Sequence, residues 1–237
     1  MDFNEIMSKF NCYEFDNVDD VNEVAGIYAW YGVCKFGKAD WGSADDFINS
    51  INSEMKKFRS PKLDASIKSS FGLRWETSFT ETTTERWIKD IESSISSDES
   101  AAGVSNLEDA LSIESNREIL CRVLNSAFPF FNTPIYVGMS GNLAKRIKKH
   151  KSQVDDIFGK KIAQPDRSML FDKGDCFAER VFGAGFSPNQ LQVCTIELPS
   201  LLEKNEIQHV SESELVKIAK IAEYFINRRI KPSLGRV

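Results

Sequence analysis

One segment constrains this chain more than any other: PIYVGMSGNLAKRIKKH, which begins at residue 134. Its β-branched start predicts a short strand over residues 134–138, which ends in a glycine turn and leads directly into a basic helix. Arg146 and His150 are four residues apart, so both side chains lie on one face of that helix. Tyr136 precedes the turn. This combination suits an anionic substrate, because it supplies fixed positive donors and a proton acceptor.

Composition narrows the class of protein. At 237 residues the chain can bury a sizeable core in one or two domains, and its 41% hydrophobic and 27% charged residues are typical of a soluble globular protein. No apolar run approaches the roughly 20 residues of a membrane helix, and the acidic N-terminus lacks the layout of a secretory signal. The five cysteines form no CxxC pair, which predicts reduced thiols in a cytoplasmic protein and argues against zinc: Cys12, Cys34, Cys121, Cys176 and Cys194.

Charge is unevenly distributed along the chain. The net charge of −5 argues against a protein that binds polyanions over its whole surface. Acidic residues dominate 75–118, whereas basic residues dominate 143–161 and 228–236. The two basic segments predict a local electropositive face, although lysines on a helix can also be simple solvated surface. The residues expected to bind nucleic-acid phosphates are Lys145, Lys148, Lys149, Lys151, Arg228 and Arg229.

Apolar patterns predict alternating strands and helices. Strands are expected at 26–33, 134–138 and 190–198, the last with clear period-two alternation. Helices are expected at 2–10, 43–59, 83–92, 116–126, 142–153, 175–182 and 212–229. A serine-rich acidic loop is expected at 93–103.

Two tripeptides on the predicted strands carry a family resemblance. Gly26-Ile27-Tyr28 and Tyr136-Val137-Gly138 resemble the two halves of the signature of GIY-YIG nucleases. Arg146 lies ten residues after Tyr136 and His150 four further on, as in members of that family. A glutamate on a late helix that ends in Lys-Pro completes the pattern, and Glu223 with Lys231-Pro232 fits it. The resemblance covers residues 22–36 and 133–236.

The resemblance implies an α+β fold with a small, mainly antiparallel three-stranded sheet flanked by helices. The family joins its two tripeptides by a short hairpin, but here more than a hundred residues separate them. A loop of that length is not structureless in a compact domain. Its helical patterns predict a large α-helical insertion at 41–132, and the nuclease-like core would then comprise residues 1–40 and 133–237.

The resemblance also implies a metal-dependent phosphodiesterase site. Tyr28 would act as the general base, Tyr136 would orient water or phosphate, and Arg146 would clamp the phosphate. His150 would donate a hydrogen bond or shuttle a proton. Glu223 would hold one Mg²⁺ or Mn²⁺ ion, since these ions favour oxygen ligands and retained waters. The other histidine, His209, lies in a polar stretch and is expected to be incidental.

Two positions depart from the family pattern: Met139 stands where lysine or glutamine is common, and Gly235 stands where asparagine follows Lys-Pro. Each matching residue also has an ordinary explanation when taken alone. The tyrosines could be strand aromatics, Arg146 a surface residue, His150 a polar group in a helix-cap region, and Glu223 a partner of Lys220 or Asn227.

Three functions therefore remain open. The first is an endonuclease acting on DNA in restriction, phage defence or mobile-element biology. The second is a nucleic-acid-binding module with a degenerate site, and the third is a protein-interaction module that binds a protein partner through its acidic insertion. The complete set of catalytic-type residues favours the first. Cleavage of both strands would favour a homodimer or two successive nicks.

Overall fold

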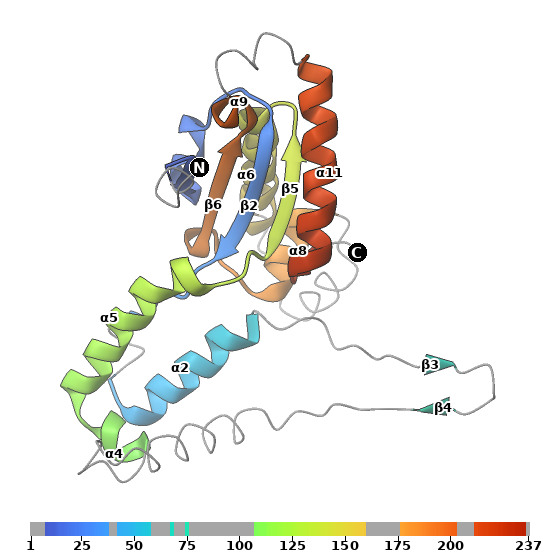
Figure 1. Ribbon diagram of the computed structural model, residues 1–237. Coiled ribbons are helices and arrows are strands. Elements are labelled where there is room, and N and C mark those ends of the chain that lie inside the picture. The colour runs from blue at the N-terminus through green and yellow to red at the C-terminus, as the bar shows by residue number, and fades with distance from the viewer. Residues whose placement is uncertain are drawn as a thin grey trace. The chain divides into compact units, whose positions relative to one another are not determined.

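The computed structural model describes residues 8–37, 42–57, 67–68, 74–75, 107–159, 176–202 and 211–235. The chain divides into two compact units (Figure 1). The first comprises Met1–Cys34 together with Phe128–Val237, and the second comprises Lys35–Ala127. None of the helices within these described ranges is long and apolar enough to cross a bilayer.

A four-stranded antiparallel sheet forms the centre of the first unit, in the order β1-β6-β2-β5. The strands are β1 (Phe10–Glu14), β2 (Gly26–Gly32), β5 (Tyr136–Ser140) and β6 (Leu191–Glu197). The predicted α+β class is confirmed in this broad form. The predicted number of strands is wrong, because the sheet has four strands rather than three.

Helices cover both faces of the sheet. Along β2, buried and half-buried residues alternate, so Tyr28 and Trp30 share one face. On that face lie α6 (Leu143–Gly159) and α8 (Phe177–Ala184), whose His150 and Phe177 contact the two aromatic rings. The other face packs on α11 (Glu212–Ile230), with Ile27 and Met139 of the sheet against Leu215, Val216 and Ala219 of the helix.

The turn before α6 comes later than the sequence suggests. Gly138 lies inside β5 and pairs with Tyr28, so the predicted strand end at this glycine is wrong. The chain turns instead at residues 140–142, where the Asn142 amide donates to Ser140 Oγ at 3.1 Å. Asn142 then caps α6, because its Oδ1 accepts from the Lys145 amide at 2.8 Å. The helix itself runs six residues beyond its predicted end.

The strand of this four-stranded sheet that the prediction lacks is β1. Phe10 begins this strand, whereas the sequence predicts a helix over residues 2–10, of which residues 2–7 lie outside the described residues. Cys12 pairs directly with Cys194 across β1 and β6, and the two form a disulfide. The prediction that all the cysteines are reduced is therefore wrong for this pair. The spacing of the cysteines in the sequence does not reveal this pair, because the two partners are 182 residues apart.

Shorter elements complete the first unit, and α11 agrees with its prediction. The 3₁₀ helices are η1 (Phe15–Asp20) and η4 (Pro188–Gln190), and α9 (Leu198–Leu201) follows β6. Ser211 caps α11 with Glu214 in a reciprocal capping box. The helix ends at Lys231, which adopts the left-handed conformation with φ of 51° immediately before Pro232.

The second unit contains α2 (Ala44–Lys57), α4 (Leu107–Ser112), most of α5 (Glu114–Phe131) and the paired two-residue strands β3 (Ile67–Lys68) and β4 (Arg74–Trp75). The buried Arg117 side chain holds the helices together by donating to the carbonyl oxygens of Gly42 and Ser112 at 3.1 and 2.9 Å, and to that of Leu111. The expected helix at 83–92 and loop at 93–103 lie outside the described residues.

Candidate functional site

Both halves of the tripeptide pair meet in the sheet. Tyr28 of β2 lies opposite Gly138 of β5, and Trp30 lies opposite Tyr136. A Cβ atom at position 138 would come within 2.6 Å of the Tyr28 hydroxyl and 3.1 Å of the Tyr136 ring. Glycine is therefore required here because the two tyrosine side chains lie over the strand backbone.

The Tyr28 hydroxyl is the centre of a hydrogen-bonded cluster. Arg146 donates to it from Nε at 3.2 Å, and His150 Nε2 lies 3.3 Å away. Tyr28 and His150 are only 1% and 3% exposed, so this cluster is largely dry. The Tyr136 ring lies 6.1 Å from that of Tyr28 and 5.7 Å from that of His150. Four of the five predicted catalytic residues therefore lie together, although they come from three separate elements.

Burial and neighbouring charge set the protonation states of the cluster. Burial raises the pKa of Tyr28, and Tyr136 adds to this effect, whereas the hydrogen bond and charge of Arg146 oppose it. Burial also lowers the pKa of His150 to about 3, assisted by the positive charges of Arg146, Arg180 and Lys149. Near neutral pH, Tyr28 is thus a phenol and His150 a neutral imidazole. His150 is not available as an imidazolium acid.

Aromatic rings enclose His150. The Trp30 ring stacks on it at 6.3 Å between centroids, and the Phe177 ring lies 4.8 Å away. These contacts fix the imidazole while leaving its Nδ1 atom buried with no hydrogen-bond partner among the described residues. A buried nitrogen without a partner is costly, so a ligand group that bonds to it would stabilise the site.

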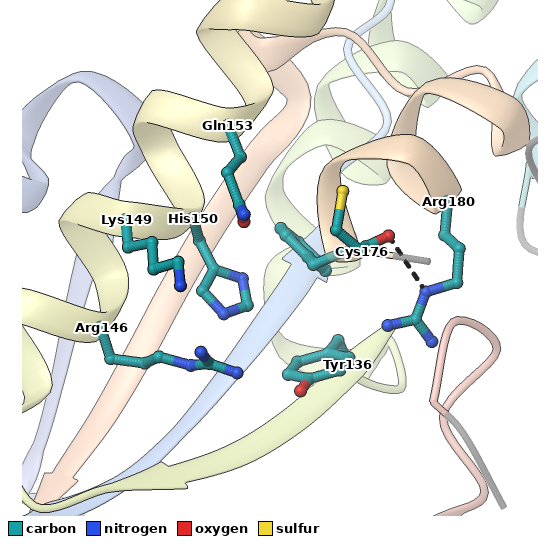
Figure 2. A pocket seen from close by; sticks show the side chains of 8 residues that line it. Tyr136, Arg146, Lys149, His150, Gln153, Cys176 and Arg180 are labelled. Atoms are coloured by element: carbon teal, nitrogen blue, oxygen red, sulfur yellow. Dashed lines mark hydrogen bonds between the residues drawn. The ribbon is translucent and has the colours of Figure 1, made fainter. Parts of the chain in front are cut away.

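A pocket of about 280 Å³ opens beside this cluster (Figure 2). Side chains of α6 line one side, α8 lines the other, and Tyr136 of β5 lies between them. The lining residues are Tyr136, Arg146, Lys149, His150, Gln153, Cys176, Phe177 and Arg180. Three of these side chains are cationic, and no carboxylate occurs among the described lining residues. Such a pocket is suited to an anion.

Two of the predicted catalytic residues do not line the pocket: Tyr28, which is buried, and Glu223. Glu223 lies half-buried on α11, where burial raises its pKa while the charges of Arg146 and Lys220 lower it. Its carboxylate therefore lies within electrostatic reach of Arg146. Among the residues that the structure describes, no group of three or more His, Cys, Asp or Glu side chains is placed to hold a metal ion. A single carboxylate together with phosphate oxygens and water nevertheless fits the coordination habits of Mg²⁺ and Mn²⁺.

The predicted basic residues fall on different surfaces. Lys149 lines the pocket, whereas Lys148 pairs with Asp19 at 3.5 Å. Lys151 pairs with Asp155 at 2.9 Å, and its Nζ lies 4.7 Å from the centre of the Phe15 ring. The remaining three are exposed: Lys145 on α6, and Arg228 and Arg229 on α11.

The sequence did not predict that Gln153 of α6 or the residues of α8 and its cap line the pocket. Gln153 lies three residues after His150 and seven after Arg146, so helical spacing alone could have placed it on the same face. Cys176, Phe177 and Arg180 carried no such signal, because their approach to the site depends on how α8 packs against α6.

No family model, curated protein or solved structure matches this chain at a significant level.

Proposed function

We propose that this protein is a metal-dependent endonuclease that hydrolyses phosphodiester bonds in DNA. The observation that supports this proposal most strongly is the Arg146–Tyr28–His150 cluster, which adjoins a pocket with three cationic side chains. The resemblance to GIY-YIG nucleases agrees with it, since four residues of that pattern converge here.

Arg146 is the proposed phosphate clamp. Its side chain reaches the pocket from α6 while its Nε atom donates to Tyr28, so the guanidinium is held in one orientation. A fixed guanidinium can donate to phosphate oxygens and stabilise the charge that develops as water attacks. Lys149 adds a second positive charge on the same wall.

The two tyrosines divide the proton chemistry. Tyr136 lines the pocket and is the one that can contact an incoming phosphate or water. Tyr28 lies beneath it and would serve as the base only in its phenolate form, which Arg146 stabilises. His150, as a neutral imidazole beside the Tyr28 hydroxyl, is a hydrogen-bond partner that helps to orient it. The proton of the attacking water would pass to Tyr136 as Tyr136 gives its own hydroxyl proton to the Tyr28 phenolate, while the bond from phosphorus to the leaving oxygen breaks.

Glu223 is the residue proposed to hold the metal ion. One bound Mg²⁺ or Mn²⁺ would neutralise phosphate charge and lower the pKa of the attacking water. Burial raises the pKa of this carboxyl group, and a bound cation would favour its charged form.

A nuclease assay tests this proposal directly. Purified protein should be incubated with supercoiled plasmid, single-stranded DNA and RNA, with Mg²⁺, with Mn²⁺ and with EDTA. We expect metal-dependent cleavage of DNA by the wild type. Glu223→Ala should abolish cleavage and leave DNA binding largely intact, because it removes the metal ligand and not the cationic pocket. Cleavage that persists in Glu223→Ala would contradict the metal role.

Two observations favour a second function, that of a nucleic-acid-binding module without catalysis. Glu223 lies outside the pocket lining, and the pKa of Tyr28 is raised, so the metal ligand and the base are the weakest parts of the proposed site. Tight DNA binding by the wild type with no cleavage under any metal condition would support this module and contradict the nuclease.

A further inference from the structure

Arg180 is a pocket residue outside the predicted catalytic set. It is 9% exposed and lies on α8, and its guanidinium carbon is 5.6 Å from the centre of the Tyr136 ring. Its Nε donates to the Cys176 carbonyl oxygen at 3.3 Å, and its Nη1 donates to the carbonyl oxygen of Leu234. These bonds hold the guanidinium at the pocket wall in a defined orientation.

Arg180 and Arg146 approach the pocket from opposite sides. Figure 2 shows Arg146 extending from α6 and Arg180 from α8, with Tyr136 between them. Both arginines line the pocket, and the positive charge of each lowers the pKa of His150, although the burial of that histidine has the larger effect. The pocket volume of about 280 Å³ lies just below the range of small-ligand pockets, roughly 300–1,000 Å³. A single phosphate group would leave much of it unfilled.

We propose that Arg180 forms a second phosphate subsite, so that the pocket binds two consecutive phosphates of one polynucleotide strand. The phosphate to be cleaved lies at Arg146, and the neighbouring phosphate lies at Arg180. This inference rests on the proposed function, which supplies the polynucleotide. The inference follows from the two arginines that line the pocket. Their oriented guanidinium groups, one on each side, match two anionic groups joined by a short linker.

A purely structural role for Arg180 is the alternative, since its bond to Leu234 also ties α8 to the segment that follows α11. The two roles differ in what they affect. A structural role changes stability, whereas a phosphate subsite changes the preference for ligands that carry two phosphates.

Nucleotide binding measures that preference without any requirement for cleavage. Thymidine 3′,5′-bisphosphate, thymidine 5′-monophosphate and thymidine 3′-monophosphate should be titrated into the full chain by calorimetry, without metal. We expect the bisphosphate to bind at least about tenfold more tightly than either monophosphate, as a charged hydrogen-bonded contact usually provides. In Arg180→Gln this preference should fall to a small factor.

A pair of variants at Cys176 gives the same test without changing Arg180. Cys176 caps α8 and lines the pocket beside Arg180. Aspartate and asparagine are both good helix N-caps of the same shape, so Cys176→Asp and Cys176→Asn differ only in charge. Cys176→Asp should lose the bisphosphate preference relative to Cys176→Asn, because its negative charge at the pocket wall near Arg180 repels a phosphate there. This comparison decides the matter if Arg180→Gln fails to fold.

The outcomes separate this inference from the proposed function. A bisphosphate preference that is lost in Arg180→Gln and in Cys176→Asp supports the second subsite, even if the chain cleaves nothing. An unchanged preference in folded Arg180→Gln and Cys176→Asp overturns it, even if the wild type cleaves DNA. Equal affinity of the wild type for all three nucleotides overturns it as well.

Discussion

His150 shows how packing sets the chemistry of a single residue. Its ring lies against Trp30 and Phe177 and close to three cationic side chains, so burial and positive charge both disfavour the imidazolium form. Its neutral form leaves the hydrogen bond with Tyr28 intact at neutral pH. The residue therefore acts as a neutral partner of the tyrosine and not as a positive charge for the phosphate.

This assignment makes a prediction for NMR and for stability. With a pKa of about 3, the His150 ring protons should show no titration between about pH 5 and 8, and His209→Gln would assign the two histidine signals. In the unfolded chain, His150 takes up a proton near pH 6.5, whereas in the folded chain it stays neutral until the pH approaches 3. Stability from this group is thus complete above about pH 6.5 and is lost as the pH falls toward 3. His150→Gln should show a shallower acid loss in urea unfolding; an equal slope would contradict the lowered pKa.

Tyr28 gives a second residue-scale prediction. Because burial raises its pKa above the ordinary value of 10.0, only a small fraction is phenolate at neutral pH. If the phenolate is the base, kcat should rise about tenfold per pH unit between about pH 7 and 9. Tyr28→Phe should lower kcat, leave DNA affinity nearly unchanged, and flatten this rise. A steep rise that persists in Tyr28→Phe would assign the base elsewhere.

At the scale of elements, the contact between β2 and β5 creates the site. Gly138→Ala would place a methyl group 2.6 Å from the Tyr28 hydroxyl, which cannot move easily because Arg146 donates to it. We expect a loss of about 1–3 kcal/mol in the free energy of unfolding, together with a large loss of cleavage. Gly159→Ala is the matched control, since nothing lies within 4 Å of its added carbon. Equal effects of the two substitutions would contradict the packing described.

Helix α6 presents different lysines to different surroundings. Lys149 lines the pocket, whereas Lys148 pairs with Asp19 near η1. Lys149→Ala should therefore weaken DNA binding more than Lys148→Ala and should reduce the salt dependence of binding more. Fluorescence anisotropy at several salt concentrations measures both effects. A greater effect of Lys148→Ala would place the nucleic acid on the η1 side of the helix.

The elements differ in how far the sequence predicts them. Strands β2 and β6 and helix α11 follow from apolar spacing and from the Ser211–Glu214 capping box, which are local signals. Strand β1 does not, because Phe10–Glu14 is held in the sheet by pairing with β6 and by the Cys12–Cys194 bond, both of them long-range. The role of Gly138 is not predictable for a similar reason. Position 138 requires glycine because side chains pack over it, and not because the chain turns there.

The same distinction applies to the site. Arg146 and His150 were predictable because helical spacing fixes their common face, and the tripeptides indicated Tyr28 and Tyr136. Arg180 and Cys176 were not, because only the packing of α8 against α6 brings them to the pocket. Glu223 lies on the predicted helix, yet the pocket lining does not include it.

For the whole molecule, the central claim is that the pocket beside Tyr28, Arg146 and His150 hydrolyses phosphodiester bonds. Arg146 is the best single residue to test, because it both lines the pocket and orients Tyr28. Arg122 provides a matched control, since it is an exposed arginine on α5 that pairs with Glu118.

The deciding measurement is the single-turnover rate of plasmid cleavage in Mg²⁺ for the wild type, Arg146→Ala and Arg122→Ala. We predict metal-dependent cleavage by the wild type, a rate lower by about 100-fold or more in Arg146→Ala, and a wild-type rate in Arg122→Ala. Cleavage of equal rate in folded Arg146→Ala, or no cleavage by the wild type in any divalent metal, would contradict the claim.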